Sequence, residues 1–414
     1  MIIAHKIALN PNRERETYFR KACGVARFSW NFALAEWQRQ YQAHLVNKSL
    51  PKPSQLSLRR QLNAVKRERF PWMLEVSKTA PQTAIINLGK AFKNFFEDLA
   101  KFRRGEIRRK DIRRPKFKKK GRHDSFRADN GPGTFTCDDY RIKLPVIGWV
   151  RMRESLRFAG KPISVTISRT AQRWFASIAV EVEHTPPLRE NQTAVGVDLG
   201  VKAMATLSAG AVIEGPKALR RYLDKLRRLS RSLSHKVKFL ANWRKAVERL
   251  ARLHARIANI RRDALHQATT AIMRKFTLIG IEDLNLRGMM ANRKLARAIA
   301  DIGAYEFRRQ LEYKAPMWNS RIVTADPWYP SSKLCSDCDA IYAELTLAER
   351  TWTCARCSTV HDRDHNAALN LRAFAVSSTV TACGGTSAGL GGRMPKVKLV
   401  PVKQEPRHEI KAHV

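Results

Sequence analysis

Apolar residues in the first quarter of the chain recur at the spacing of helices. Met1–Leu9 alternates loosely and predicts one strand, whereas Pro11–Phe102 carries aromatic and small apolar residues three and four positions apart. This spacing places them on one face of a helix, and Pro51 and Pro53 interrupt the run. We therefore predict a mainly helical domain, in which packing of the aromatic rings against one another is favoured over stacking on nucleic-acid bases.

Between Ser125 and Val182 the pattern changes to short runs of β-branched and aromatic residues, separated by Gly, Pro and Asp. Many short strands with such turn residues are typical of a small barrel or sandwich. The segment His184–Asn191 follows, and its two prolines predict a linker into the next domain.

A third region alternates strands and helices. Apolar runs predict strands, and leucines at helical spacing predict helices within Pro216–Lys275 and at Ala304–Met317. The predicted strands are Ala194–Val197, Ala203–Leu207, Ala211–Ile213, Leu278–Ile281 and Ser320–Ala325. Val376–Val414 is rich in Ser, Thr and Gly, then mixed and polar, and has no periodicity, so we expect it to be disordered.

Three acidic residues stand at the ends or starts of these elements. Asp198 directly follows the first strand of the region, Glu282 ends the fourth, and Asp364 precedes a helical run. A carboxylate at the end of a buried strand is unfavourable unless its charge is compensated, although capping of a turn explains a single Asp equally simply. Together the three acids predict a site for two Mg²⁺ ions, because hard cations prefer carboxylate oxygens and an ion pair can clamp a phosphodiester.

Two cysteine pairs predict a second metal site. Four of the seven cysteines form two CxxC pairs: Cys335, Cys338, Cys354 and Cys357. Four thiolates at this spacing indicate one tetrahedral Zn²⁺ ion, and a site closed by four cysteines has no position for water, so the zinc is expected to be structural. Tyr342 and Trp352 are expected to cover it, and His361 is interpreted as a neighbour of the site or a surface residue. Metal-binding cysteines fit a reducing, cytoplasmic location.

The net charge indicates a polyanionic partner. The 414 residues include 78 Lys and Arg against 36 Asp and Glu, a formal charge of +42. A membrane surface would favour one basic amphipathic anchor, whereas here the basic residues are spread over several segments. Lys101–Lys120 holds twelve basic residues and two acids, and Pro216–Lys275 eighteen and three. Each could be a solvated surface, but this density favours binding to phosphates.

Two missing patterns argue against a membrane span and against ATP hydrolysis. No apolar run approaches twenty residues, so we expect no transmembrane helix. No GxxxxGK[ST] loop is present, which argues against ATP hydrolysis.

The order of four motifs resembles the RuvC nuclease of the TnpB family. These are GVDLG at Gly196–Gly200, IEDL at Ile281–Leu284, the CxxC pairs, and DRDHNAALN at Asp362–Asn370. TnpB proteins are insertion-sequence-encoded, RNA-guided DNA endonucleases related to the type V CRISPR nucleases. The resemblance implies an α+β multidomain fold with a helical recognition lobe, a small β-barrel wedge domain and an RNase H-like (RuvC) nuclease domain that carries an inserted zinc ribbon of four cysteines.

The resemblance also implies domain boundaries. They are the first wedge strand at 1–10, the helical recognition domain with its basic segment at 11–120, the wedge barrel at 121–190, the first part of the nuclease at 191–330, the zinc ribbon at 331–360, the last nuclease helix at 361–375 and a disordered tail at 376–414.

The resemblance implies that the protein cleaves DNA. Asp198, Glu282 and Asp364 would be the catalytic residues and would hold two Mg²⁺ ions. A guide RNA would pair with one strand of a double-stranded DNA target, and the protein would read a short flanking motif. The cut would leave 3′-hydroxyl and 5′-phosphate ends.

Contacts to nucleic acid are implied by the resemblance for a few further residues: Ser77, Lys78, Gln82, Thr83 and Arg363. A cluster that caps the following helix is an equally good explanation for the first four.

Three other functions would use similar residues. A DNA-binding regulator derived from a nuclease would keep the basic surface and lose acids, whereas all three acids are present here. A strand-joining transposase would also use three carboxylates, but the family motifs and the zinc insertion argue against it. A compact type V CRISPR effector has the same chemistry and differs in its neighbouring genes.

Overall fold

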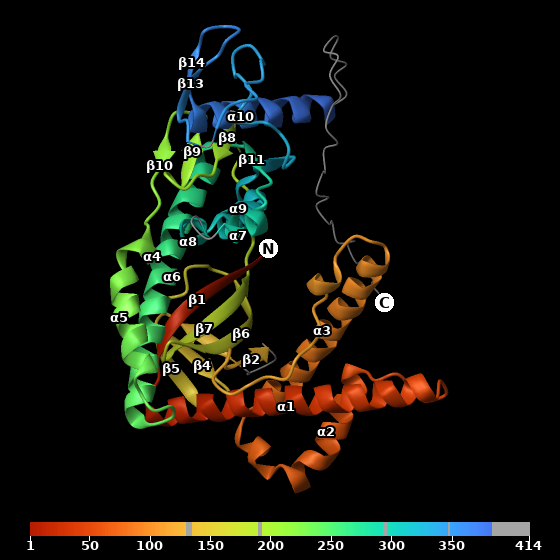
Figure 1. Cartoon of the computed structure of the whole chain (residues 1–414). Coiled ribbons are helices and arrows are strands. Elements are labelled where there is room, and N and C mark those ends of the chain that lie inside the picture. The colour runs from red at the N-terminus through yellow and green to blue at the C-terminus, as the bar shows by residue number, and fades with distance from the viewer. Residues whose placement is uncertain (130–134, 189–192, 293–295, 347, 383–414) are drawn as a thin grey trace. The chain divides into compact units, whose positions relative to one another are not determined.

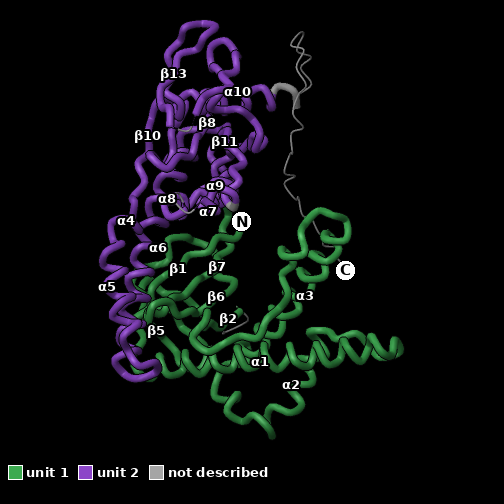
Figure 2. The backbone as a smooth tube through the Cα atoms, viewed as in Figure 1, with its two compact units in different colours: residues 1–184 green, residues 185–414 purple. Residues whose placement is uncertain are grey.

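The computed structural model describes residues 1–129, 135–188, 193–292, 296–346 and 348–382, and the chain divides after His184 into two compact units (Figure 2). Each unit has its own sheet and its own hydrophobic core. Within the described ranges, no helix combines the length and the apolar composition needed to span a bilayer.

Unit 1 begins with strand β1 (Ile2–Asn10) and continues into helices (Figure 1). The helices are α1 (Arg13–Val46), α2 (Gln55–Arg69) and α3 (Thr79–Arg103), with 3₁₀ turns η1 (Pro71–Glu75) and η2 (Arg109–Asp111). Asn12 caps α1 by accepting a hydrogen bond from the Arg15 amide, and Ser54 caps α2. The rings of Trp37 and Phe92 stack between α1 and α3 with centroids 4.1 Å apart, which confirms the predicted packing of aromatic rings.

Seven strands of unit 1 form one antiparallel sheet in the order β2-β6-β7-β1-β5-β4-β3. Besides β1 they are β2 (Ser125–Asp129), β3 (Thr136–Asp138), β4 (Arg141–Leu144), β5 (Gly148–Met152), β6 (Lys161–Thr170) and β7 (Arg173–Glu181). β1 pairs with β7 through Ile2–Ala8 and with β5 through Leu9 and Asn10, so one strand joins the two halves of the sheet.

The predicted barrel is not formed by the described strands. β2 and β3 stand at the two ends of the strand order and do not pair with each other, so the sheet is open. Helices α1 and α3 pack against β2 instead, and the Phe126 ring of β2 lies 5.8 Å from the Phe19 ring of α1. Burial against the helices thus covers this end of the sheet, which closure would otherwise have protected.

Unit 2 contains a five-stranded sheet in the order β10-β9-β8-β11-β12. β8 (Ala194–Asp198), β11 (Leu278–Glu282) and β12 (Arg321–Ala325) are parallel, whereas β9 (Ala205–Leu207) and β10 (Val212–Ile213) form the antiparallel side. The five strands predicted from the apolar runs are all confirmed.

Helices follow and separate these strands. They are α4 (Ala218–Arg221), α5 (Leu223–Ser234), α6 (Ala241–Lys275), α7 (Leu286–Ala291), α8 (Ala296–Ile302) and α9 (Ala304–Lys314), with the 3₁₀ turn η3 (Ala315–Trp318). A hairpin of β13 (Thr351–Thr353) and β14 (Val360–Asp362) then leads into the last helix, α10 (Arg363–Ala382).

Helix α10 lies directly on the backbone of two central strands. A Cβ atom on Gly196 of β8 would come within 1.8 Å of the Ala368 carbonyl oxygen, and one on Gly280 of β11 within 2.2 Å of the Leu371 carbonyl oxygen. Gly196 and Gly280 are also partners in the β8–β11 register. The helix can approach this closely only because both strands present glycine at the same level of the sheet.

The end of α10 corrects one prediction. The chain was expected to be disordered from Val376, but Val376–Ala382 continues the helix. The hydroxyls of Ser377 and Ser378 donate hydrogen bonds to the Phe374 carbonyl, so these polar residues are accommodated within the helix. Residues 383–414 lie outside the described part of the chain, and the prediction for them stays a prediction.

Replacing Gly280 with Ala should destabilise unit 2. The new Cβ would overlap a backbone carbonyl of α10, and such overpacking destabilises by about 1–3 kcal/mol or more. The melting temperature, followed by circular dichroism, should fall by roughly 3–10 °C. Gly215→Ala is the matched control, because a Cβ there would meet Met204 Cβ at an ordinary 3.5 Å. Equal melting temperatures for the two variants would contradict the close approach.

Candidate active site and cysteine cluster

Asp198 and Glu282 lie at the same edge of the unit 2 sheet. Each is the last residue of its strand, and the parallel register pairs Val197 with Ile281. Because the carboxyl ends of neighbouring parallel strands meet at one edge, the two carboxylates that follow this pair are neighbours.

Asp364 reaches the same edge from the first turn of α10. Burial raises the pKa of Asp198 to about 7, and the charges of Asp364 and Glu282 add to this rise. Burial also raises the pKa of Glu282, against the opposing charge of Arg363. The charges of Asp364 and Glu282 therefore act on Asp198 at this edge of the sheet.

Two arginines accompany the acids. Arg350 Nη1 lies 3.4 Å from Asp364 Oδ1, and the Arg350 carbonyl accepts a hydrogen bond from the Arg363 amide N–H. Both guanidinium charges oppose the rise in the pKa of Asp198. Sequence reasoning found Arg363 through its motif but missed Arg350, which precedes β13 and has no spacing relation to the acids.

Two asparagines fix α10 to residues 331–336, which lead into the first cysteine pair. Asn366 Nδ2 donates to the Leu334 carbonyl at 2.7 Å, and its Oδ1 accepts from the Ser336 amide at 3.0 Å. Asn370 Nδ2 donates to the carbonyls of Ser331 and Leu334. Both side chains are buried, so these bonds replace hydration and hold the helix in one position.

Three further acids near the site have structural partners. Asp283 forms an ion pair with Arg308. The Asp362 carboxylate accepts from the His365 amide at the start of α10, and the Asp326 carboxylate accepts from the Trp328 amide in the turn after β12. Asp326 and Asp362 are therefore local caps.

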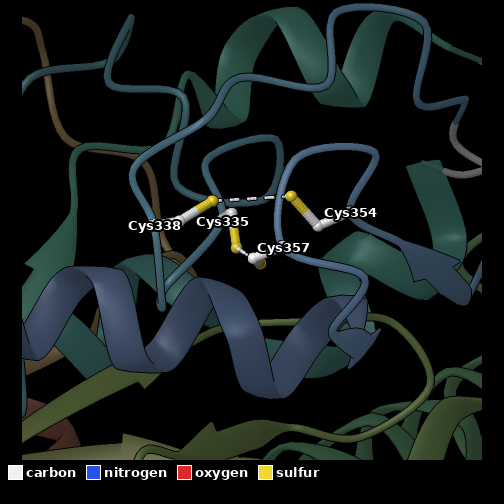
Figure 3. Close-up of side chains that lie close together, drawn as sticks. All are labelled: Cys335, Cys338, Cys354 and Cys357. Carbon is white, nitrogen blue, oxygen red and sulfur yellow. Dashed lines mark hydrogen bonds between the residues drawn. The ribbon is translucent and has the colours of Figure 1, made fainter.

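The four cysteines form a compact cluster (Figure 3). Their sulfur atoms all lie within 4.8 Å of one another, with Cys335 Sγ 3.5 Å from Cys357 Sγ and Cys338 Sγ 3.6 Å from Cys354 Sγ. The two CxxC pairs therefore converge as their spacing predicted, and the cluster is a possible structural metal site.

His361 and two aromatic rings surround this cluster. His361 Nε2 lies 3.1 Å from Cys335 Sγ, and the residue is buried. Trp352 stacks on Tyr342 with centroids 5.5 Å apart and lies against His361 at 4.7 Å. His361 is therefore a neighbour of the sulfurs and not a surface residue, and the two rings cover the cluster as expected.

The acids are more widely spaced than the sulfurs. In the part of the chain that the structure describes, the cysteines are the one group of three or more potential ligands whose donor atoms all lie within 4.8 Å of one another. A site for two ions accepts the wider spacing, because the ions themselves stand roughly 3.5–4 Å apart.

Glu282 borders two cavities of unit 2. One, of about 450 Å³, extends towards the cysteine-bearing segment and includes Lys333 and Arg363 in its lining. The other, of about 460 Å³, includes Tyr305 and Arg308. Glu282 thus borders open space on two sides, whereas Asp198 and Asp364 line neither cavity.

The predicted nucleic-acid contacts of unit 1 differ in accessibility. Lys78 is exposed and Gln82 half-buried, and both line a cavity of about 120 Å³. Thr83 is 5% exposed, and its hydroxyl donates to the Thr79 carbonyl at 2.7 Å. The Ser77 hydroxyl lies 2.9 Å from the Thr79 hydroxyl. Ser77 and Thr83 therefore organise the start of α3.

Comparisons with known proteins identify the family. Family models described as "Helix-turn-helix domain", "Probable transposase" (OrfB_IS605) and "Cas12f1-like, TNB domain" match residues 1–45, 177–293 and 305–371. A protein of Escherichia coli (strain K12), "Putative RNA-guided DNA endonuclease InsQ", is 35% identical, covering 99% of this chain and 98% of that protein. The chain belongs to the TnpB family. Another TnpB relative, from Streptomyces pristinaespiralis and named "Putative RNA-guided DNA endonuclease", is 35% identical over 92% of this chain and 90% of its own.

A solved structure shares the fold of this TnpB chain. The structure titled "Cryo-EM structure of the Cas12f1-sgRNA-target DNA complex" aligns with a TM-score of 0.52 and 14% identity over 87% of this chain and 83% of that chain. Residues 1–45, matched by the helix-turn-helix model, form β1 and most of α1, a continuous helix of 34 residues.

The raised pKa of Asp198 predicts an effect of pH on stability. The folded state keeps a proton on Asp198 up to about pH 7, whereas the unfolded chain releases it near its ordinary pKa of 3.8. The free energy of unfolding should therefore fall as pH rises through this window. Asp198→Asn cannot ionise, so in Mg²⁺-free buffer at pH 8 it should melt roughly 2–4 °C above the wild type, and the difference should vanish near pH 4.

The control for this experiment is Asp224→Asn, whose side chain is 94% exposed and should change little. If Asp198→Asn and the wild type had the same melting temperature at pH 8, the pKa of Asp198 would not be raised in the folded state.

Proposed function

We propose that the protein is an RNA-guided DNA endonuclease that hydrolyses phosphodiester bonds in an active site formed by Asp198, Glu282 and Asp364. The observation that carries this proposal is the position of Asp198 and Glu282 at the neighbouring ends of β8 and β11, together with the charges of Asp364 and Glu282, which raise the pKa of Asp198. A partly buried group of like charges is unfavourable unless protons or cations compensate it. The names of the relatives, which specify RNA-guided DNA endonucleases, support the same reaction.

The acids fit a pair of Mg²⁺ ions. They offer carboxylate oxygens, which this hard cation prefers, and they come from three rigid elements. When bound, the ions would lower the pKa of an attacking water and neutralise charge that develops on the phosphate. Protons compete for the same oxygens, because the pKa of Asp198 lies near neutral pH.

Arg363 is suited to hold the scissile phosphate. It lines the cavity beside Glu282, and its charge acts on both Glu282 and Asp198. A guanidinium donates paired hydrogen bonds to phosphate oxygens, so it would orient the phosphate beside the acids.

Guide RNA and double-stranded DNA are the proposed partners. A net charge of +42 favours a polyanionic partner, and basic residues are dense in Arg113–Lys120 of unit 1 and along α5 and α6 of unit 2. Helix α5 has no buried residue, so its arginines and lysines face solvent. Phosphate contacts position a nucleic acid, and base pairing with the guide would supply the sequence specificity.

Reading of a short flanking motif is assigned to Lys78 and Gln82. The small cavity that they line also includes Arg59 and Lys66, which gives it a positive charge suited to DNA.

The cysteine cluster is proposed to hold one structural Zn²⁺ ion. Tetrahedral Zn–S bonds of about 2.3 Å would place the sulfurs about 3.8 Å apart, and two of the distances here are 3.5 and 3.6 Å. The adjacent His361 would donate its N–H to Cys335 Sγ, a typical support for a metal-bound thiolate.

Asp198→Ala should abolish DNA cleavage while RNA binding is retained. With protein that carries its copurifying RNA, cleavage of a matched double-stranded target in Mg²⁺ should fall more than about 100-fold, because an ion would lose a ligand. RNA affinity should change less than about twofold, since the basic segments lie elsewhere in the sequence. Gel analysis measures the products, and filter binding measures the RNA.

Asp224→Ala is the control of equal charge change and should cleave normally. Joined DNA strands in place of cleaved ends would identify a transposase. Loss of RNA binding in Asp198→Ala would contradict the proposed separation of catalysis from RNA binding.

Cys354→Ser should lower zinc content and stability together. The wild type should contain about one zinc per chain by elemental analysis, and the variant much less, with a lower melting temperature. Cys137→Ser serves as the control, because Cys137 lies in unit 1 outside the cluster. Unchanged zinc stoichiometry in Cys354→Ser would refute the four-cysteine site.

A further inference from the structure

An aromatic pocket lies in unit 1 where α2 ends beside α1. The pocket has a volume of about 530 Å³, and its lining includes four aromatic rings and two arginines: Phe28, Phe32, Phe70, Trp72, Arg27 and Arg69. Arg27, Phe28 and Phe32 lie on one face of α1, whereas Phe70 joins α2 to η1 and Trp72 lies in η1.

The rings meet edge to face and leave part of their surfaces open. The Phe28 ring lies 4.7 Å from Phe70 at 63° and 5.0 Å from Trp72 at 76°. Trp72 is 41% exposed, and Phe28 and Phe70 are half-buried. Ring–ring packing therefore holds the walls in place while a flat aromatic surface remains accessible.

Two arginines stand at the edge of the pocket. Arg69 lies over the Phe70 ring at 5.7 Å, and Arg27 stands 3.5 Å from Asp124. None of the described lining residues is acidic. This combination of rings and guanidinium groups suits a planar group attached to an anion.

A basic segment passes beside the same pocket. Asn31, which also lines the pocket, exchanges two hydrogen bonds with the backbone of Lys118, at 2.8 and 3.0 Å. Trp30 donates to the Lys116 carbonyl, and Lys118 Nζ lies 4.1 Å from the Trp30 ring centroid. Residues 113–120 contain six basic residues, of which Arg113 forms an ion pair with Asp98, so the other five supply a row of positive charge along α1 next to the rings.

We propose that this pocket binds an unstacked nucleobase of a single-stranded RNA or DNA segment whose phosphates contact residues 113–120. The inference rests on the proposed function only in taking nucleic acid as the partner. Stacking accepts any base, whereas paired bases within a duplex cannot enter, so the pocket selects single strands.

The test compares wild type with Trp72→Ala in binding to 15-nucleotide single strands and to the corresponding duplexes. Fluorescence anisotropy would give the affinities, with separate RNA and DNA arms to identify the source of the base. Trp72→Ala should weaken binding of at least one kind of single strand roughly tenfold and change duplex binding less than twofold. Phe102→Ala is the matched control, because the exposed fraction of Phe102, 39%, is similar to the 41% of Trp72, and Phe102 does not line the pocket.

Photocrosslinking locates the base independently of affinity. Strands containing 4-thiouridine or 4-thiothymidine should crosslink wild-type peptides that contain residues 24–32 or 69–72. Arg69→Gln leaves the rings in place and should weaken single-strand binding less than Trp72→Ala does. The slope of its affinity against salt concentration should fall by about the value of one phosphate contact. This variant keeps the test valid if Trp72→Ala lowers the melting temperature.

The outcomes separate this proposal from the nuclease proposal. Equal single-strand affinities of wild type and Trp72→Ala in both arms, or crosslinks confined to other peptides, would overturn the pocket and leave cleavage at Asp198 standing. Weaker single-strand binding with crosslinks at the pocket would support it even if no target were cut. If another protein surface occupied the pocket, Trp72→Ala would change the oligomeric state of the protein and leave its affinity for nucleic acid unchanged, which would overturn the proposal.

Discussion

The contact of α10 with bare strand backbone determines the geometry of unit 2. At Gly196 and Gly280 no side chain separates the helix from the sheet, so its height above β8 and β11 is set by backbone atoms. Asp364 lies one turn before Ala368, which meets Gly196, and Asp198 lies two residues after Gly196. A contact made by backbone atoms alone thus positions Asp364 of the helix relative to Asp198 of the strand.

The same helix ties the cysteine cluster to the acids. Asn366 and Asn370 bond to the backbone that leads into the first cysteine pair, while β14 continues directly into α10. The segment between them supplies Arg350, whose guanidinium lies beside Asp364. Loss of order in the cysteine cluster would therefore disturb both the support of α10 and the charge balance of the carboxylates.

Sequence patterns predicted what local periodicity and chain order control. The strands of unit 2, their acids and the cysteine pairs were found because a strand end, a turn glycine and a CxxC spacing are local features. The barrel predicted for unit 1 is not confirmed, because closure requires β2 and β3 to pair, and among the described strands they do not. The asparagine clamps and Arg350 escaped for a related reason: their roles exist only once α10 lies on Gly196 and Gly280.

Electrostatic repulsion explains why the charges of the three acids must be compensated before a phosphate can approach them. A carboxylate repels a phosphate, and at an effective dielectric constant of about 20 two unit charges 4 Å apart interact by about 4 kcal/mol. Three uncompensated acids would therefore keep a DNA strand away from the strand ends, while the +42 charge of the whole chain attracts it elsewhere. Arg350 and Arg363 offset part of this repulsion, and protonation of Asp198 offsets more. Bound divalent cations would complete the compensation, so attraction of the polyanion and access to the acids depend on different charges.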